Sequence, residues 1–252
     1  MRFTGKTAVI TGGGGVIGRA TARLLHKEGA NVVLVDHAPE SLAPIAAELG
    51  AARILTIAAD VTKADDCRTY ARSARNAFGP IDIFFNNAGI EGPAAPMTEF
   101  PEDEFARVMA VNVTGVFLGL KYVLPEMRDG GSVIITSSTA GLRGAPNFTA
   151  YTASKHAVVG LMRTAAVENA ARRIRVNTIH PAMVDSEMMR RIERSRQGNK
   201  SLEEVQQEYR NRIPLGRYIM PEEIADTVAH LASDASNMVT GTQVLVDGGS
   251  ML

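Results

Sequence analysis

A tyrosine and a lysine four residues apart form the first candidate pair for acid–base chemistry in this chain. They are Tyr151 and Lys155, in the segment YTASK. If the segment is helical, positions i and i+4 place the phenol and the ammonium group on one face. A neighbouring cation favours phenolate and lowers the pKa of tyrosine from its ordinary value of about 10. We therefore expect Tyr151 to exchange a proton with an alcohol; the alternative interpretation is an aromatic–lysine pair on a helix surface.

A glycine-rich turn near the N-terminus is a candidate site for a dinucleotide. Gly12, Gly14 and Gly15 follow the apolar run TAVIT, and Ile17 and Gly18 open a predicted helix. Glycine permits a tight turn and a close approach of the backbone, while the free N–H groups and the dipole of a helix start favour a pyrophosphate. Taken alone, the cluster fits a plain strand-to-helix turn equally well.

Asp36 strengthens the dinucleotide interpretation. It ends the next apolar run, NVVLVD, 18 residues after Gly18. This is close to the spacing of about 20 at which a carboxylate binds the adenosine ribose hydroxyls. The same carboxylate would repel a 2′-phosphate, so the sequence favours NAD over NADP. The alternative for Asp36 is a solvated loop residue or a helix cap.

The candidates stand at the ends of short β-rich runs that alternate with helical stretches. The runs are TAVIT, NVVLVD, RILTIAAD, IDIFFNN, GSVIITSS, RIRVNTIH and TQVLVD, with long helices expected near 102–127 and 149–171. Runs that are apolar on both faces are typical of a buried parallel sheet. We predict an α/β fold in which residues 1–252 form a single domain, a doubly wound (Rossmann) parallel sheet of seven strands with helices on both faces.

One segment interrupts this alternation. Residues 186–216, SEMMRRIERSRQGNKSLEEVQQEYRNRIPLG, are charged, helical in propensity and longer than a usual connection in such folds. Loops that leave the carboxyl ends of parallel strands surround the ligand crevice. We therefore expect this insertion to be a lid over the substrate; the alternative is a solvated pair of surface helices.

Composition excludes several other classes of protein. Lysine plus arginine number 27 and aspartate plus glutamate 27, so the formal net charge is zero and no basic excess indicates nucleic acid as a partner. The single cysteine, Cys67, cannot form an internal disulfide, and the five histidines show no HExxH spacing, so we predict no metal. Neither an apolar leader nor a run of about 18 apolar residues is present, which predicts a cytoplasmic protein without a membrane partner.

Further motifs make the chain resemble the short-chain dehydrogenase/reductase (SDR) family over essentially its whole length. Ser138 stands 13 residues before Tyr151 at the end of IITSS, NNAG occupies 86–89, and DGG occurs near the C-terminus. The asparagine in MAVNVTG is Asn112. The resemblance implies that Ser138 orients the reacting oxygen and that Asn112 supports a proton relay through Lys155. It also implies that Tyr151 transfers the hydroxyl proton while a hydride passes between nicotinamide and the carbinol carbon.

The resemblance implies further contacts to the dinucleotide. The family's adenine-contacting aspartate matches Asp60, which Val61 follows. The remaining contacts come from the NNAG segment, from the YxxxK pair and from the segment after the sixth predicted strand: Asn87, Ala88, Gly89, Tyr151, Lys155, Pro181, Val184 and Ser186.

Two positions depart from the family pattern. Val16 stands where TGxxxGxG has its second-to-last glycine, and Ala182 stands where PGxVxT has glycine. A β-branched residue disfavours positive φ and adds bulk. We expect a shifted loop in which Gly15 takes the glycine's role; the alternative is a less closely held pyrophosphate. Ala182 costs backbone freedom where the lid begins.

The candidate substrate pocket is mostly apolar. Its residues flank the catalytic strand ends or begin the lid: Leu142, Arg143, Phe148, Met183, Met188, Met189 and Ile192. They suggest an apolar cyclic or aryl substrate, although the two adjacent methionines could simply pack the lid, and Arg143 could be solvated.

The function we predict is an NAD(H)-dependent oxidoreductase that interconverts a secondary alcohol and a ketone. A 3-oxoacyl-(acyl carrier protein) reductase and a non-catalytic dinucleotide sensor remain as alternatives. The resemblance implies a homotetramer assembled through the helices near 102–127 and 149–171.

Overall fold

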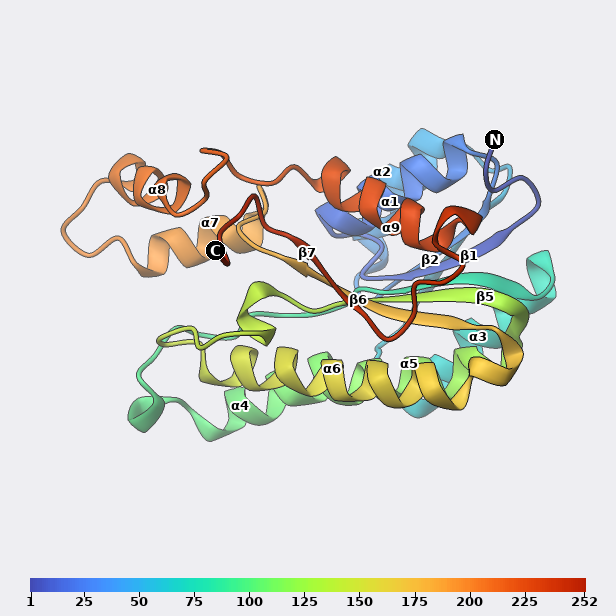
Figure 1. The fold of residues 1–252 in the computed structure, drawn as a ribbon, viewed down its shortest axis with the longest axis horizontal. Helices are drawn as coiled ribbons and strands as arrows, with labels where there is room; N and C mark the ends of the chain where they lie inside the picture. The colour runs from blue at the N-terminus through green and yellow to red at the C-terminus, as the bar shows by residue number, and fades with distance from the viewer.

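The seven predicted strands form one parallel sheet in the computed structural model, which describes residues 1–252 (Figure 1). The chain builds outward from the first strand to the third and then crosses to the other side of the first, so the strand order reverses between β1 and β4. Across the sheet the strands are β3 (Ile54–Ala58), β2 (Asn31–Asp36), β1 (Thr7–Thr11), β4 (Ile81–Asn86), β5 (Met127–Thr136), β6 (Arg175–Pro181) and β7 (Gln243–Val246). Ligands bind at such a reversal, beyond the carboxyl ends of the strands.

Helices cover both faces of the sheet, which confirms the predicted doubly wound fold (Figure 1). One face carries α1 (Val16–Lys27), α2 (Pro39–Leu49) and α9 (Pro221–Ala232). The opposite layer contains α3 (Ala64–Phe78), α4 (Glu102–Met109), α5 (Gly115–Val123) and α6 (Thr149–Glu168).

The continuous apolar runs follow from this double covering. In β1, Val9 belongs to the apolar core under α3, α5 and α6, whereas Ala8 and Ile10 belong to the core under α1 and α9. Successive side chains of a strand point to opposite faces, so a strand buried on both must be apolar at every position. All three side chains are fully buried.

Two predicted elements differ in their bounds. The strand expected to begin at Gly131 begins at Met127, because Met127 pairs with Ile81 before the register shifts. The single helix expected near 102–127 is α4 and α5 joined by a π-helical turn (Ala110–Thr114) and followed by a 3₁₀ turn (Leu124–Glu126). Single π turns inside helices recur at functional sites, and this one carries Asn112.

The combined helix Glu102–Glu126 is long and apolar enough to cross a membrane by length and composition alone. Here it lies along the sheet and contacts α3 and α6. Its α5 part buries Val116, Leu118, Leu120 and Val123. Gly119 allows the close approach, because a Cβ there would lie 3.0 Å from the Phe84 ring.

Residues 186–216 fold as two helices, α7 (Glu187–Ser195) and α8 (Leu202–Asn211), which extend beyond the carboxyl end of β6 (Figure 1). They enclose a small apolar core, made of Met189, Val205, Tyr209 and Ile213 together with Tyr218 from the segment that follows. We call these two helices and their connections the helical insertion. Its packing is independent of the two cores of the sheet.

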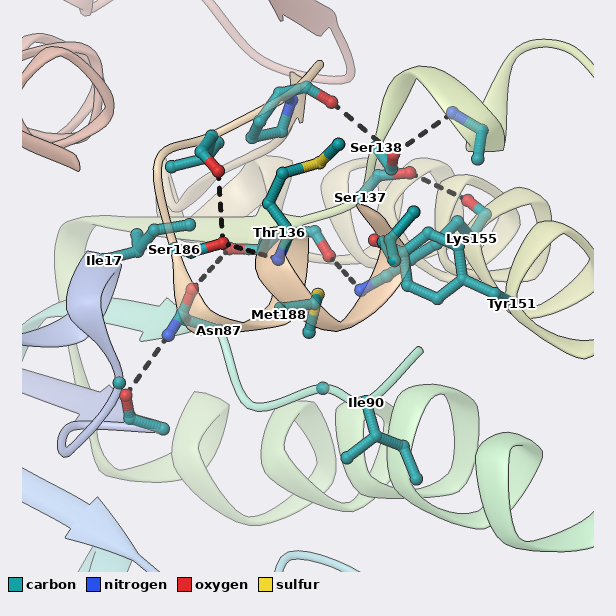
Figure 2. A pocket seen from close by; sticks show the side chains of 18 of the residues that line it. Ile17, Asn87, Ile90, Thr136, Ser137, Ser138, Tyr151, Lys155, Ser186 and Met188 are labelled. Atoms are coloured by element: carbon teal, nitrogen blue, oxygen red, sulfur yellow. Dashed lines mark hydrogen bonds between the residues drawn. The ribbon is translucent and has the colours of Figure 1, made fainter. Parts of the chain in front are cut away.

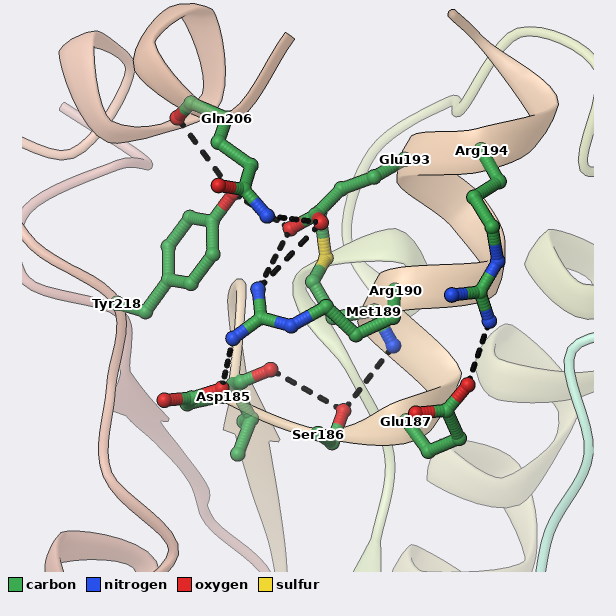
Figure 3. A network of polar contacts seen from close by, with 10 residues as sticks. Asp185, Ser186, Glu187, Met189, Arg190, Glu193, Arg194, Gln206 and Tyr218 are labelled. Carbon is green, nitrogen blue, oxygen red and sulfur yellow. Dashed lines mark hydrogen bonds and ion pairs between the residues drawn. The ribbon is translucent and has the colours of Figure 1, made fainter. Parts of the chain in front are cut away.

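A buried carboxylate joins the parts of the helical insertion (Figure 3). Glu193 is fully buried and accepts hydrogen bonds from Tyr218 Oη at 2.7 Å and Gln206 Nε2 at 2.9 Å. Arg190 pairs with Glu193 at 3.1 Å and with Asp185, before α7, at 2.5 Å. A buried charge is tolerated when it is paired and hydrogen-bonded in this way, so the network holds the insertion together as one unit.

Candidate active site

A large cavity lies at the reversal of the strand order, beyond the carboxyl ends of β1, β2, β4, β5 and β6. Its volume is about 1140 Å³. Ligand pockets usually span roughly 300–1,000 Å³, so this cavity is large enough for an extended ligand together with a second, smaller one. The helical insertion borders one end of the cavity, and the glycine turn borders the other.

The glycine turn is shaped by close approaches that a side chain would block. Gly12 has φ +65°, and a Cβ there would lie 3.0 Å from Ala88 Cα. A Cβ on Gly14 would lie 2.0 Å from Ser41 Oγ. Gly18 does not line the cavity, although the sequence placed it among the cofactor contacts. Its role is packing, because a Cβ there would lie 2.2 Å from the Gly12 carbonyl oxygen.

Val16 is the first residue of α1 and lines the cavity. Gly15 is the helix N-cap with φ −75°, and the left-handed position of the turn is Gly12. Neither Val16 nor Ala182 has positive φ, so both departures from the family pattern are free of backbone strain. The N–H groups of Val16 and Ile17 donate to no protein atom, which leaves donors at the cavity edge for an anion.

Asp36 ends β2 and borders the cavity beside His37. Its carboxylate accepts hydrogen bonds from the N–H of Gly14 at 3.0 Å and of Ala38 at 3.3 Å. His37 Nδ1 lies 3.1 Å away. The other residues that the sequence placed around a dinucleotide also line the cavity: Asp60, Val61, Asn87, Ala88, Gly89, Pro181, Val184 and Ser186. Donors for a pyrophosphate and a carboxylate for ribose thus lie along one cavity, which fits a dinucleotide.

Asn87 connects the strands at the reversal of strand order through hydrogen bonds (Figure 2). Its backbone N–H donates to Thr11 Oγ1 at 3.0 Å, and its side-chain nitrogen donates to the Thr11 carbonyl at 3.1 Å. Its side-chain oxygen accepts from Thr136 Oγ1 at 3.0 Å. One side chain therefore joins the ends of β1, β4 and β5.

Tyr151, Lys155 and Ser138 meet on the wall of the cavity (Figure 2). Tyr151 and Lys155 lie on α6, and Lys155 Nζ is 5.5 Å from the centre of the Tyr151 ring. The ammonium group is buried and donates to the Thr136 carbonyl at 2.8 Å. Ser138 follows β5, and its Oγ accepts from the Ala140 N–H at 3.1 Å.

The pKa of Tyr151 differs from the expectation. Burial raises it to about 12, hydrogen bonding to Ser138 acts against this shift, and the charge of Glu91 adds to it. Burial also lowers the pKa of Lys155 to about 8. The expected lowering by the lysine is thus wrong for this structure, because desolvation of the phenolate dominates. At neutral pH Tyr151 is a phenol, which is the form that donates a proton.

Asn112 is buried beneath the cavity and does not line it. Its side-chain nitrogen donates to the Ile90 carbonyl and to Ser154 Oγ, both at 2.9 Å, and its oxygen accepts from the Ile90 N–H at 2.9 Å. A Cβ on Gly89 would lie 3.2 Å from Asn112 Oδ1 and 3.3 Å from Lys155 Nζ. The Asn112 amide and the Lys155 ammonium group therefore both lie next to Gly89.

His180 is a residue of the site that sequence reasoning missed. It is fully buried, and its Nδ1 lies 2.8 Å from the Ser138 carbonyl oxygen. Its Nε2 lies 2.8 Å from Thr178 Oγ1. Burial lowers the pKa of His180, so the ring is neutral and bonds the backbone of Ser138. No spacing motif includes this histidine. Thr178 lies two residues before it on β6, but the Ser138 carbonyl is brought to its ring only by the pairing of β5 and β6.

The cavity beside the helical insertion is lined by six of the residues that the sequence predicted for a substrate pocket: Arg143, Phe148, Met183, Met188, Met189 and Ile192. The prediction that Leu142 belongs to this pocket is wrong. Leu142 ends the 3₁₀ turn Thr139–Gly141 and does not line the cavity. Ser186 lines the cavity and also caps α7, because its Oγ accepts from the Met189 N–H at 3.1 Å.

An ion pair crosses from the helical insertion to the loop after β4. Arg191 Nε lies 2.6 Å from Glu91 Oε1, and a second nitrogen lies 3.2 Å from Oε2. The Glu91 side chain is only 11% exposed. Glu91 directly follows the NNAGI segment, which is the one sequence signal that could have identified it.

Comparison with known proteins places this site in a family. A family model described as enoyl-(acyl carrier protein) reductase matches residues 14–251. Levodione reductase of Leifsonia aquatica is 41% identical over 98% of this chain and 95% of its own. A crystal structure of a levodione reductase superimposes with a TM-score of 0.95 over 99% of both chains, at 41% identity. Cyclohexanol dehydrogenase of Acinetobacter sp. (strain SE19) is 35% identical over 98% of this chain and 95% of its own.

The crystal structure of an NAD⁺-bound xylitol dehydrogenase is similar over 99% of this chain and 100% of its own. Its sequence is 36% identical, and its TM-score is 0.94. The family model and these relatives match nearly the whole chain. The chain belongs to the short-chain dehydrogenase/reductase family.

Proposed function

We propose that the protein interconverts a secondary alcohol and its ketone with NAD(H), on an apolar cyclic or aryl substrate. The observation that carries the proposal is the convergence of Ser138, Tyr151 and Lys155 on a cavity that also reaches Asp36. The family supplies the reaction class, an oxidoreductase acting on CH–OH groups with a nicotinamide cofactor. The names of levodione reductase and cyclohexanol dehydrogenase support a cyclic substrate, as does the apolar lining of the cavity.

The cofactor supplies the hydride donor or acceptor when it is bound. The free N–H groups of Val16 and Ile17 would hold its pyrophosphate, and Asp36 would accept hydrogen bonds from the adenosine ribose. The residues proposed to contact the cofactor are Gly12, Gly14, Gly15, Ile17, Asp36, Asp60, Val61, Asn87, Ala88, Gly89, Tyr151, Lys155, Pro181, Val184 and Ser186.

Tyr151 Oη is the proposed acid and base. In reduction it gives its proton to the developing alkoxide oxygen, and in oxidation it takes the hydroxyl proton. Ser138 Oγ would orient the reacting oxygen, and Lys155 would hold the nicotinamide ribose while its ammonium group stands beside the phenol. Asn112 is a positioning residue, because its amide fixes the backbone of Ile90 next to Lys155.

Two further proposals concern the helical insertion and assembly. Residues 186–216 act as a lid on a single catalytic domain, supported by their place on the cavity and by the Arg191–Glu91 pair. Four copies assemble in the cytoplasm into a homotetramer through the layer of α5 and α6. Phe117 on α5 is 46% exposed and Val167 on α6 is 78% exposed, and such an interface would bury both side chains.

The first prediction concerns the catalytic tyrosine. Tyr151→Phe removes only the phenolic hydroxyl, so we expect NADH to bind as before while turnover falls by roughly 10²- to 10⁴-fold, the usual contribution of a general acid. The measurement is NADH oxidation with cyclic ketones, aryl ketones and acetoacetyl thioesters, with cofactor binding followed by fluorescence. Near-normal turnover would contradict the assignment.

The same panel of carbonyl compounds separates the proposal from its alternatives. NADH-dependent reduction of cyclic or aryl ketones, absent in the variant, supports the proposal. NADPH-dependent reduction of thioesters instead would indicate a 3-oxoacyl-(acyl carrier protein) reductase. Cofactor binding without turnover of any compound would indicate a dinucleotide sensor.

The second prediction concerns cofactor choice. Asp36→Asn keeps an oxygen that can accept the Gly14 N–H but removes the charge that would repel a 2′-phosphate. We expect the preference for NADH over NADPH in kcat/KM to fall by at least about tenfold, equivalent to about 1.4 kcal/mol. Arg19 lines the same end of the cavity and forms no ion pair, so adding Arg19→Gln should reverse part of this change. An unchanged preference would show that Asp36 does not select the cofactor.

The third prediction concerns pH. Tyr151 is protonated at neutral pH, so alcohol oxidation should accelerate as the pH rises, while ketone reduction stays level over the neutral range. The carboxylate of Glu91 raises the pKa of Tyr151, and Arg191 neutralises that carboxylate. Glu91→Gln should therefore move the oxidation profile to lower pH by about half a unit, and Arg191→Gln should move it to higher pH.

The two variants control for each other. Loss of the ion pair alone would loosen the lid in both and would shift both pH profiles in the same direction. The profiles are obtained from kcat/KM for oxidation of a cyclic alcohol between neutral and alkaline pH. Coincident profiles for the two variants would rule out an electrostatic role for the pair.

The fourth prediction concerns assembly. Analytical ultracentrifugation should give a tetramer for the protein, and Val167→Asp should dissociate it, because burying an unpaired carboxylate in an apolar interface is costly. Met238→Asp is the matched control, since Met238 is 95% exposed and lies outside α5 and α6. A monomer for the unaltered chain would remove the proposal.

A further inference from the structure

Three arginines at the substrate end of the cavity have no carboxylate partner. Arg143 follows the 3₁₀ turn Thr139–Gly141, Arg196 is the C-cap of α7, and Arg212 is the C-cap of α8. All three line the cavity, and none belongs to an ion pair, in contrast to Arg191 on the same wall. They come from three separate segments of the sequence, so only the folded chain brings them to one space.

The guanidinium group of Arg196 is held in place by two contacts. Its Cζ lies 5.4 Å from the centre of the Phe148 ring, and one terminal nitrogen donates to the Pro146 carbonyl at 3.0 Å. Its Nε is buried and has no hydrogen-bond partner. A buried donor without an acceptor costs free energy, so this nitrogen favours a ligand that supplies one.

Arg212 reaches the same space from the other helix of the insertion. Its Cζ lies 5.3 Å from the centre of the Tyr209 ring. Burial raises the pKa of Tyr209, while the charges of Arg196 and Arg212 both act against that shift, so the two guanidinium groups lie near one phenol. A side cavity of about 360 Å³ is also lined by Arg196, Tyr209 and Arg212.

The acidic groups around this end are neutralised by other partners. Glu91 pairs with Arg191, and Glu187 pairs with Arg194 at 2.5 Å. Glu208, which lines the side cavity, pairs with Lys200, and the buried Glu193 pairs with Arg190. The three unpaired arginines therefore leave an excess of positive charge in a partly enclosed space, which attracts anions.

We propose that Arg196 and Arg212, with Arg143 at the rim, bind a carboxylate carried by the substrate on the side away from its reacting carbon. A guanidinium group that is stacked on an aromatic ring presents a fixed fork of donors, which matches the two oxygens of a carboxylate. Phe148, Met183 and Met188 line the same cavity and would contact the apolar body of the substrate. The inference rests on the proposed function and names its substrate class: cyclic ketones and alcohols that bear a carboxylate.

The test compares a ketone that bears a carboxylate with its neutral methyl ester, which is larger by one methyl group. We would measure kcat/KM with NADH for 4-oxocyclohexanecarboxylate and for its methyl ester, in the unaltered protein and in Arg196→Gln, Arg212→Gln and the double variant. Arg210→Gln is the matched control, because Arg210 lies on α8 beside Arg212 but bonds Gln207 and does not line the cavity. Binding of cyclohexanecarboxylate and of cyclohexanecarboxamide to the NADH-loaded protein, by calorimetry, gives a readout without turnover.

We expect the unaltered protein to prefer the carboxylate by at least about tenfold, mainly through KM, and the preference to weaken as the ionic strength rises. Each single variant should reduce it, the double variant should abolish it, and Arg210→Gln should retain it. The calorimetric preference should change in parallel.

Equal kcat/KM for the two ketones, or a preference that survives in the double variant, would overturn the carboxylate site while leaving the proposed function intact. Failure to reduce even the methyl ester and other neutral ketones would count against the proposed function itself. A phosphate has similar anionic oxygens, so acetoacetyl-coenzyme A and its uncharged N-acetylcysteamine analogue are compared as well. A preference confined to the coenzyme A thioester, and lost in the double variant, would identify a phosphate and overturn the carboxylate assignment.

Discussion

The reversal of strand order between β1 and β4 is the constraint on which the rest of the structure depends. The connections after these two strands leave toward opposite faces, so a crevice opens where they part. Thr11 and Asn87 close its floor through side-chain and backbone hydrogen bonds. Because all seven strands are parallel, the segments that follow them meet at this same edge. The glycine turn, Asp36 and Ser138 become neighbours only through that geometry.

Burial then determines the protonation state of the two groups proposed for catalysis, Tyr151 and Lys155. The phenol of Tyr151 and the ammonium group of Lys155 lie on the same wall of the cavity, and desolvation disfavours the charged form of each. The tyrosine is thereby kept as an acid at neutral pH. Lys155 keeps its place by donating to the Thr136 carbonyl, and the neutral ring of His180 holds the backbone of Ser138. Hydrogen bonds to backbone atoms thus position the side chains that would touch the substrate.

The helical insertion brings charge to a site whose core is apolar. Its own small core and the buried Glu193 network make it a unit, and the Arg191–Glu91 pair fastens that unit to the loop after β4. The carboxylate of Glu91 also raises the pKa of Tyr151, so the residue that holds the insertion in place also affects the protonation of the phenol. The Arg191–Glu91 pair therefore connects the helical insertion to a carboxylate that raises the pKa of Tyr151.

The sequence by itself determined the fold and the pairing of Tyr151 with Lys155, because local periodicity fixes strands and helices and because these two residues share a face of one helix. It also located Asp36 and the glycine turn from spacing along two neighbouring strands. Only the tertiary structure decided that Gly18 packs rather than lines the cavity, that Leu142 lies outside it, and that burial raises the pKa of Tyr151. These outcomes depend on desolvation and on contacts between distant segments, which no local pattern records.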